Sequence, residues 1–301
     1  MAAVIICSDF GAPKFKNLLL LQEKSKTRRE QGLFVVEGRR ELEHCIEAGY
    51  NIRTVFVCPE IAGAETEEVV CSKPMATLGH VRGRGPLRSS GRGRSEAETV
   101  LNRQSSGVGA PVIIEIPEEL YRKAAYREGT EGIIAEVEVK EFSLNDLSLP
   151  ENPLIVVLEA VEKPGNLGAI LRSADAAGAD AVIVCDPLTD LYNPNLIRSS
   201  IGAIFTVPTV AASSEEVIPW LKAKGIKILT AQLQDSKLYY DTDMSCGTAI
   251  VMGTESTGLS GKWREAADAH IRIPMLGRLD SLNVSVSAAI LLFEAVRQRQ
   301  S

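Results

Sequence analysis

Short apolar runs alternate with longer mixed segments along the second half of this chain. The apolar runs predict buried strands at residues 154–158, 181–185, 227–232, 249–252 and 270–273, with a shorter strand near 206–210. Between them, helices are expected near residues 168–177, 194–201, 214–224 and 282–299. Strands that alternate with helices are typical of a parallel sheet that helices cover on both faces. We therefore predict an α/β fold for this half.

The first half shows a shorter version of the same pattern. Its apolar runs predict strands at residues 34–36, 55–57, 112–116 and 132–137. Residues 38–48 predict a helix that Gly49 ends, and a second helix is expected to begin at Pro117. Residues 141–153, which carry Asn, Asp and Pro, predict a linker. The expected domains are therefore residues 1–145 and residues 151–301.

Residues 62–110 interrupt the first of these domains. They are rich in Arg, Gly and Ser, with Arg-Gly tracts at residues 82–85 and 91–94. This composition cannot bury a core, so it predicts disorder. Such tracts can bind RNA without a fold. No aromatic residue is interleaved with the arginines, which favours an inert inserted loop.

Composition limits the classes of protein that this chain can represent. The net charge of −6 argues against a wholly basic nucleic-acid binder but allows local basic patches. Six cysteines without a C-x-x-C pair and only three histidines predict neither a disulfide framework nor a metal site. A reducing compartment, the cytoplasm, is therefore expected. No apolar run approaches the ~18 residues of a membrane helix, and the apolar start lacks the basic residues of a signal peptide.

Lysines and arginines crowd the first thirty residues. They are Lys14, Lys16, Lys24, Lys26, Arg28 and Arg29. Such a cluster can form a face that contacts RNA phosphates. A solvated helix face would look the same, and taken alone it is the more common explanation.

Two glycine-containing loops directly follow predicted strands. One is Gly253-Thr254-Glu255-Ser256-Thr257-Gly258, and the other is Ile273-Pro274-Met275-Leu276-Gly277-Arg278. In an open α/β sheet, ligands bind at the carboxyl ends of the strands. The second loop leads into residues 284–296, which are apolar nearly all round and should be buried on both faces, one against a second subunit. Ser281 is the expected N-cap of that helix.

Glycine spacing argues against two common nucleotide motifs. Gly253 and Gly258 are spaced as in a P-loop, but Leu259 stands where a P-loop needs lysine. Residues 165–168 do not match the dinucleotide fingerprint, which disfavours a nucleotide-binding oxidoreductase. Two explanations of these glycines remain. They can form a wall of a binding site where the backbone approaches a ligand closely, or ordinary turns at strand ends.

Three segments in order resemble the SpoU-type (TrmH-like) RNA ribose 2′-O-methyltransferases of the SPOUT superfamily. They are residues 166–178, the Gly253 loop with Glu255, and residues 273–275 with residues 281–285. The resemblance covers residues 151–301 well and the first domain loosely. It implies a parallel-sheet α/β knot, an exception to the rule against knots. It also implies a preceding small ribosomal-protein-like α/β module that grips RNA.

The resemblance further implies a homodimeric enzyme. Such an enzyme methylates a ribose 2′-hydroxyl of rRNA or tRNA with S-adenosylmethionine. The matching cofactor positions are Gly253, Ile273, Met275 and Leu282. The matching catalytic positions are Asn166, Arg172, Glu255, Ser281 and Asn283. The expected RNA contacts are Lys14, Lys16, Lys26, Arg28 and Arg29 from the basic cluster, with Ser199 and Ser200 by resemblance.

Arg172 carries the main mechanistic expectation. A permanently charged guanidinium is a poor base, so we expect it to stabilise the developing alkoxide while phosphate or water accepts the proton. Asn166, expected in the loop before the helix, would add a second donor at a helix start that favours an anion. The alternative is a protein that binds RNA but has lost methyl transfer. The intact polar motif residues argue against that alternative.

Overall fold

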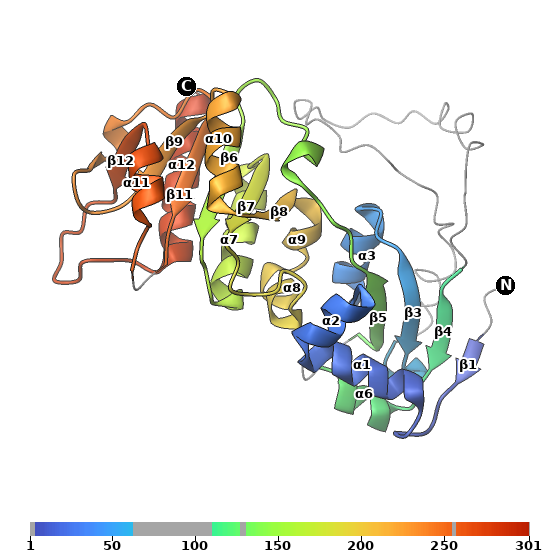
Figure 1. Cartoon of the computed structure of the whole chain (residues 1–301). Helices are drawn as coiled ribbons and strands as arrows, with labels where there is room; N and C mark the ends of the chain where they lie inside the picture. The colour runs from blue at the N-terminus through green and yellow to red at the C-terminus, as the bar shows by residue number, and fades with distance from the viewer. Residues whose placement is uncertain (1–3, 63–109, 127–130, 255–256, 301) are drawn as a thin grey trace, which may run out of the picture.

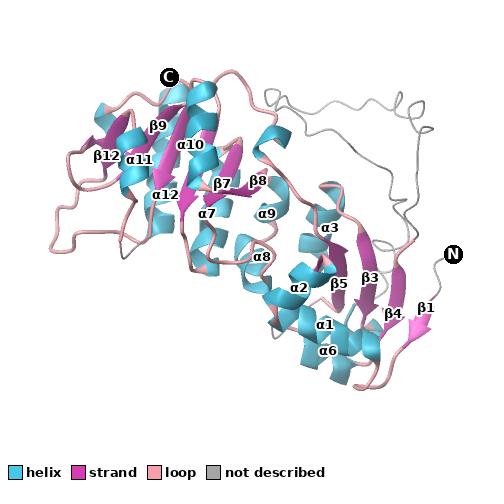
Figure 2. Ribbon diagram, viewed as in Figure 1, coloured by secondary structure: helices cyan, strands magenta, loops and turns pink. Residues whose placement is uncertain are grey.

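The computed structural model describes residues 4–62, 110–126, 131–254 and 257–300 (Figure 1). The described chain forms two sheets, one from each half, with helices packed around both (Figure 2). The predicted insert at residues 62–110 lies almost wholly outside the described residues. The α/β fold class predicted from the sequence is confirmed for both halves.

The first sheet has five strands in the order β1-β4-β3-β5-β2. They are β1 (Val4–Ile6), β2 (Leu33–Glu37), β3 (Ile52–Val57), β4 (Val112–Glu115) and β5 (Ile133–Glu138). β5 runs antiparallel to β2 and β3, and the other pairs are parallel. The helices around it are α1 (Pro13–Glu23), α2 (Ser25–Gln31), α3 (Arg39–Glu47), α4 (Pro59–Ala62) and α6 (Glu118–Ala124). The four predicted strands are confirmed, while β1 was not predicted.

The second sheet has seven strands in the order β10-β12-β9-β11-β6-β7-β8, and every pair is parallel. They are β6 (Leu154–Glu159), β7 (Ala181–Cys185), β8 (Thr209–Ala212), β9 (Lys227–Ala231), β10 (Lys237–Leu238), β11 (Thr248–Met252) and β12 (Ala269–Arg272). The five longer predicted strands agree with these bounds to within one residue. The predicted parallel sheet is therefore confirmed, and the knotted chain path stays a prediction.

Helices cover both faces of the second sheet, as the alternating pattern predicted. One face packs against α7 (Pro164–Ala177), α8 (Pro194–Ser200), α9 (Ala203–Thr206) and α12 (Val284–Arg299). The other face packs against α10 (Ser214–Ala223) and α11 (Gly261–Ala266). α7 begins four residues before the predicted helix because Pro164 occupies its first position, where proline is tolerated.

The two halves share one hydrophobic core along a seam, where α2, β2 and α3 meet α8, α9 and residues 190–192. Phe34 of β2 stacks on Tyr192, with ring centroids 4.3 Å apart. The centroid of the Phe205 ring lies 6.0 Å from that of Phe34. Arg28 of α2 donates to Asp190 Oδ2 at 2.6 Å. The seam therefore combines aromatic packing with an ion pair between the halves.

The position of Arg28 corrects its predicted role as an RNA contact. Its side chain is only 3% exposed, and its Nη1 atom also donates to the carbonyls of Leu21 and Gln22 at 2.6 and 3.1 Å. A guanidinium with these partners is not available to a phosphate. Other members of the basic cluster that were predicted to contact RNA are exposed: Lys14, Lys16, Lys26 and Arg29.

Candidate active site

The three motif segments meet at one edge of the second sheet. α7 follows β6, the Gly253 loop follows β11, and residues 273–283 follow β12. β6 and β11 are neighbours, and β9 alone separates β11 from β12. Because all these strands are parallel, their carboxyl ends lie at the same edge (Figure 1).

A hydrogen bond joins the first motif to the third. Asn283 Nδ2 donates to Asn166 Oδ1 at 3.1 Å. Asn166 lies in the first turn of α7, so its predicted place in the preceding loop is wrong. Asn283 is the N-cap of α12, and its Oδ1 accepts from the Ser285 N–H at 3.0 Å. The starts of two helices therefore meet here, and both favour an anion.

Ser281 is not the N-cap that the sequence predicted. Its exposed hydroxyl donates to Asp280 Oδ1 at 3.0 Å. α12 begins only at Val284, so the residue directly before it, Asn283, supplies the capping oxygen. Asn and Ser have nearly equal preferences for this position, and the sequence did not separate the two.

Gly253 is the point where the first loop approaches itself most closely. A Cβ atom here would collide with the carbonyl of Gly258 and lie 2.6 Å from the Leu259 nitrogen. Thr254 pairs with Gly258 in an antiparallel bridge, and Gly258 has φ +67°. Only glycine fits at position 253, as expected for a wall formed by backbone. Glu255 and Ser256 lie outside the described residues, so the proposed role of Glu255 stays a prediction.

The second loop presents the apolar side chains that were predicted to hold a cofactor. Ile273 and Met275 are half-buried, and Ile273 packs against the core. Leu282 is 37% exposed at the start of α12. Close backbone on one side and apolar side chains on the other can grip a ligand mainly through backbone and apolar contacts.

Arg172 lies in the middle of α7 and is exposed. Within the part of the chain that the structure describes, its side chain forms no hydrogen bond or ion pair. Six residues after Asn166, it lies ~9 Å further along the helix and about 120° round its axis. The prediction that these two residues are paired donors at one helix start is therefore wrong. The catalytic role of Arg172 itself stays a prediction.

Ser200 is buried, which corrects its predicted role as an RNA contact, whereas Ser199 is half-buried and its predicted role stays a prediction. Ser199 Oγ donates to the Pro164 carbonyl at 3.2 Å, and a Cβ atom on Gly168 would collide with this serine. Ser200 is 1% exposed and donates to the Ile197 carbonyl at 2.8 Å. The absence of a side chain on Gly168 lets α8 approach α7 closely.

Glu159, which sequence reasoning missed, fixes the downstream end of the Gly253 loop. It ends β6, is 8% exposed, and its Oε2 accepts from the Ser260 N–H at 2.8 Å. Ser260 is the residue before α11. The available sequence signal was a lone carboxylate at the end of an otherwise apolar strand.

A second chain of hydrogen bonds holds α11 in place. Trp263, which is fully buried, donates from Nε1 to Ser214 Oγ at 2.9 Å. Ser214 Oγ in turn donates to Asp186 Oδ2 at 2.6 Å. The loop that follows β11 is thus anchored to the ends of both β6 and β7.

Two cysteine thiols near or beneath the sheets are poor nucleophiles. Burial and, to a smaller extent, the nearby Asp186 carboxylate raise the pKa of Cys185 to about 12. Burial and a hydrogen bond to Glu60 raise the pKa of Cys58 to about 11. Neither thiol forms the thiolate that nucleophilic cysteine chemistry requires near neutral pH.

Two kinds of feature are absent from the described residues. No group of His, Cys, Asp and Glu side chains is placed to hold a metal ion. Among the helices described, none has the length and apolar character needed to cross a membrane.

Two family models match this chain. Residues 153–293 match the SpoU rRNA methylase family, and residues 12–79 match the MRM3-like substrate-binding domain. The first match contains all three motif segments. The second contains the basic cluster, β2 and α3.

Two curated relatives extend these matches. The 23S rRNA (uridine(2479)-2′-O)-methyltransferase of Streptomyces viridochromogenes is 31% identical over 289 residues, covering 94% of this chain and 88% of that protein. The 23S rRNA (guanosine-2′-O-)-methyltransferase RlmB of Vibrio cholerae is 38% identical over 222 residues, covering 68% and 90%.

Two solved structures superimpose on nearly the whole chain. A crystal structure of an RNA 2′-O ribose methyltransferase has a TM-score of 0.76 at 34% identity and covers 99% of this chain and 100% of the other. The AdoMet-bound rRNA methyltransferase of Sinorhizobium meliloti has a TM-score of 0.80 at 26% identity and covers 99% of each chain.

Proposed function

Since this chain belongs to the SpoU family of rRNA methylases, we propose that it methylates a ribose 2′-hydroxyl of 23S rRNA with S-adenosylmethionine as the methyl donor. The bond between Asn166 and Asn283 carries the proposal, because it joins two motifs and two helix starts at the strand ends. The names of the relatives favour 23S rRNA over the tRNA that the sequence left open. They differ in the base, uridine or guanosine.

The loops after β11 and β12 suit S-adenosylmethionine, whose sulfonium supplies the methyl group. Gly253 lets the first loop close on itself at Gly258, and the backbone of this loop would lie against the cofactor. Ile273, Met275 and Leu282 would give its apolar parts a surface. Glu159 keeps the first loop in the shape that this contact requires.

The residues around the helix starts would position the ribose for attack. Asn166 and Asn283 lie where two sets of helix N–H groups converge, so they suit the phosphate beside the target ribose. The 2′-oxygen must attack in line with the leaving sulfur, so positioning supplies much of the rate. Arg172 would stabilise the negative charge that develops on this oxygen, while phosphate or water accepts the proton. Because Arg172 lies on another side of α7 from Asn166, this role requires the RNA, or the site of a second copy, to reach that side.

A homodimer through α12 is part of the proposal. Its inner face packs in the core, but Val286 and Phe293 are 46% and 49% exposed in the single chain. These two residues and Leu282 follow the spacing of one helix face. A second copy would cover this face next to the proposed cofactor residues.

The two halves would divide the work. Residues 1–145 would bind RNA, which the substrate-binding match and the exposed lysines support, and residues 151–301 would transfer the methyl group. The Arg-Gly insert lies outside the described residues, and its inert character stays a prediction. The cytoplasm is the proposed location, because cysteines without a disulfide framework suit a reducing compartment.

Methyl incorporation into unmodified 23S rRNA transcripts, followed by mapping of 2′-O-methyl groups, tests the proposal. We expect one modified nucleotide. Calorimetry with S-adenosylmethionine distinguishes the enzyme from the alternative, a non-catalytic RNA-binding protein. A chain that binds RNA but neither binds the cofactor nor transfers a methyl group would establish that alternative.

A further inference from the structure

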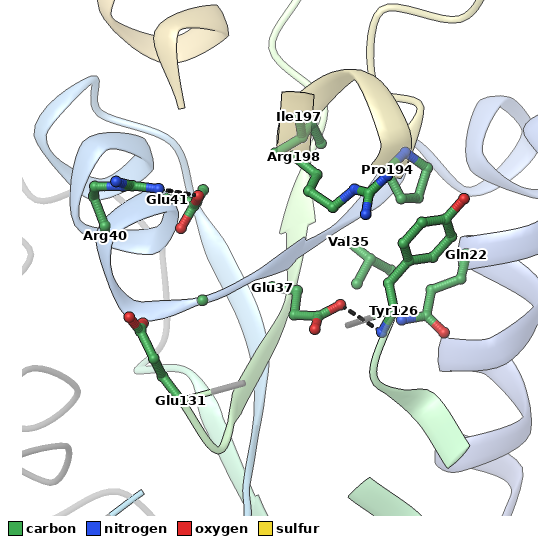
Figure 3. A pocket seen from close by; sticks show the side chains of 11 residues that line it. Gln22, Val35, Glu37, Arg40, Glu41, Tyr126, Glu131, Pro194, Ile197 and Arg198 are labelled. Carbon is green, nitrogen blue, oxygen red and sulfur yellow. Dashed lines mark hydrogen bonds and ion pairs between the residues drawn. The ribbon is translucent and has the colours of Figure 1, made fainter. Parts of the chain in front are cut away.

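An open pocket lies in the seam, away from the proposed cofactor residues (Figure 3). One wall comes from β2 and α3, within the region that matches a substrate-binding domain, and the opposite wall is α8. Its charged and aromatic lining residues are Glu37, Arg40, Glu41, Tyr126, Glu131 and Arg198. None of the described residues predicted to be catalytic lines this pocket.

An aromatic ring and a guanidinium lie together in this pocket. The Arg198 guanidinium lies 4.9 Å from the centroid of the Tyr126 ring, and the Tyr126 side chain is 52% exposed. Arg198 Nη2 donates to Asn195 Oδ1 at 2.9 Å, and the Tyr126 N–H donates to Glu37 Oε2 at 2.8 Å. The first bond orients the guanidinium, and the second fixes the backbone that carries the ring. Proteins stack unpaired RNA bases on aromatic rings and arginine planes of this kind.

The carboxylates of the pocket select the chemistry of its ligand. Glu37, Glu41 and Glu131 line the pocket together with two arginines. Arg40 pairs with Glu41 at 3.0 Å, and Glu37 and Glu131 each accept from a backbone N–H, of Tyr126 and Arg39. Three carboxylates disfavour a phosphate but accept hydrogen bonds from the amino and imino groups of a base. Guanine presents two such donors side by side, which match the two oxygens of one carboxylate.

The pocket lies one helix away from the proposed catalytic residues. The serine that follows Arg198 in α8, Ser199, contacts the Pro164 carbonyl at the start of α7. An α-helix is about 10 Å across, so a chain of RNA can reach from one side of α8 to the other within a few nucleotides. The Arg28–Asp190 pair and the Phe34–Tyr192 stack hold the two walls together, so the pocket is formed before RNA binds.

We propose that this pocket binds one unpaired base of the RNA substrate, guanine in preference to the others, near the nucleotide that is methylated. The base stacks on Tyr126 beside Arg198, and its amino and imino hydrogens are donated to the carboxylates. The inference rests on the proposed function for the identity of its ligand as RNA. It adds a contact that reads sequence outside the methyl-transfer site.

Fluorescence anisotropy with the full chain and short labelled oligouridylates tests this proposal. The oligonucleotides carry a central guanosine, a central inosine, which lacks the 2-amino group, or uridine only. We expect guanosine to bind several-fold tighter than inosine. Tyr126→Ala should weaken binding of the guanosine oligonucleotide by about 5- to 100-fold, since one stacked base is lost. The salt dependence of binding should not change, because no phosphate contact is removed.

Three matched variants sharpen the test. Tyr126→Phe keeps the ring and should bind as the wild type does. Tyr240→Ala removes an exposed tyrosine outside the pocket and should also have no effect. Glu131→Gln replaces one acceptor oxygen of an exposed carboxylate with a donor and should abolish the preference for guanosine over inosine.

Wild-type affinity in Tyr126→Ala, or an affinity loss that comes with a smaller salt slope, would overturn the proposal. Hydrogen exchange on the wild-type chain gives a readout that needs no variant: adding the guanosine oligonucleotide should protect residues 35–41 and 194–198, and lack of protection would also overturn it. Methyl transfer is assayed separately. Methyl transfer without base binding would refute only the base-binding role of the pocket. Base binding without methyl transfer would refute the proposed function.

Discussion

The seam and the strand-end site are built from the same polar residue types and use them in opposite ways. At the seam, Arg28 is 3% exposed and has one carboxylate and two carbonyl partners. At the strand-end site, Arg172 is exposed, with no such bonds among the described residues. Serine hydroxyls divide in the same way, because Ser200 of α8 is 1% exposed whereas Ser281 is exposed. Burial, and not residue type, separates side chains that fix the molecule from those that can meet a substrate.

Breaking the seam should have the largest effect, and it should appear in stability. Arg28→Ala leaves Asp190 without its guanidinium partner and removes the donor to two carbonyls. We expect a loss of about 3–5 kcal/mol in the free energy of unfolding, measured by urea denaturation.

The adjacent residue supplies the control for this change. Arg29→Ala removes an exposed charge and should alter stability by less than about 0.5 kcal/mol. It should instead reduce the log–log salt slope of RNA binding by about 0.7–0.9. If both variants lowered stability equally, the distinction between buried and exposed arginines would fail.

The matching change at the strand-end site should appear in rate. Arg172→Ala should lower turnover by about 10²–10³-fold, or roughly 3–4 kcal/mol, with cofactor affinity and stability nearly unchanged. Methyl incorporation and calorimetry measure the two quantities in parallel. Arg172→Lys keeps the charge but loses the planar fork, so a large defect would indicate bidentate contact and a small one a point charge. Wild-type turnover in Arg172→Ala would refute its catalytic assignment.

The exposed face of α12 is intermediate between the buried seam and the open strand-end site, because it is exposed in the single chain and would be buried in the proposed dimer. Phe293→Ala should weaken the proposed dimer by about 2 kcal/mol, because an aromatic anchor is lost. Light scattering over a dilution series measures the shift. Leu188→Ala, at an apolar side chain that is 63% exposed elsewhere, should leave the mass unchanged. A wild-type chain that is monomeric at micromolar concentration would contradict the proposed dimer.

The smallest effect is expected at Glu159, a buried residue that acts on the open site through a loop. Glu159→Gln retains an acceptor for the Ser260 N–H but removes its charge, so cofactor affinity should fall by about 3- to 10-fold, or ~1 kcal/mol. The KM for S-adenosylmethionine should rise while kcat holds. Glu265→Gln, an exposed change on α11, should do neither. An equal response in both variants would mean that the anchoring bond has no specific role.

Periodicity predicted the larger elements of both sheets because buried runs have a clear signal. It missed the strands β1 and β10 and the helices α4, α9 and α11, which are too short to show a period. It also did not predict α1 and α2, which lie in the basic first part of the chain. The motif loops were placed correctly at the strand ends. These features depend on neighbours in sequence.

The errors at the candidate sites share a different cause. Arg28, which was predicted to contact RNA, meets a carboxylate 162 residues away. Glu159, which was not predicted at all, is joined to an amide 101 residues away. No local pattern encodes such partners, so the sequence could not show that these two side chains fix the fold.

The order of strands in the second sheet also has a consequence for biosynthesis. β11 lies between β6 and β9 but is made after both, so until Thr248–Met252 leaves the ribosome the sheet has a gap at its centre. During that interval, β6 and β9 each present an unpaired apolar edge, which can pair with other nascent chains. Chains truncated before Thr248 should aggregate, and chaperones that cover apolar strands should be needed until β11 closes the gap.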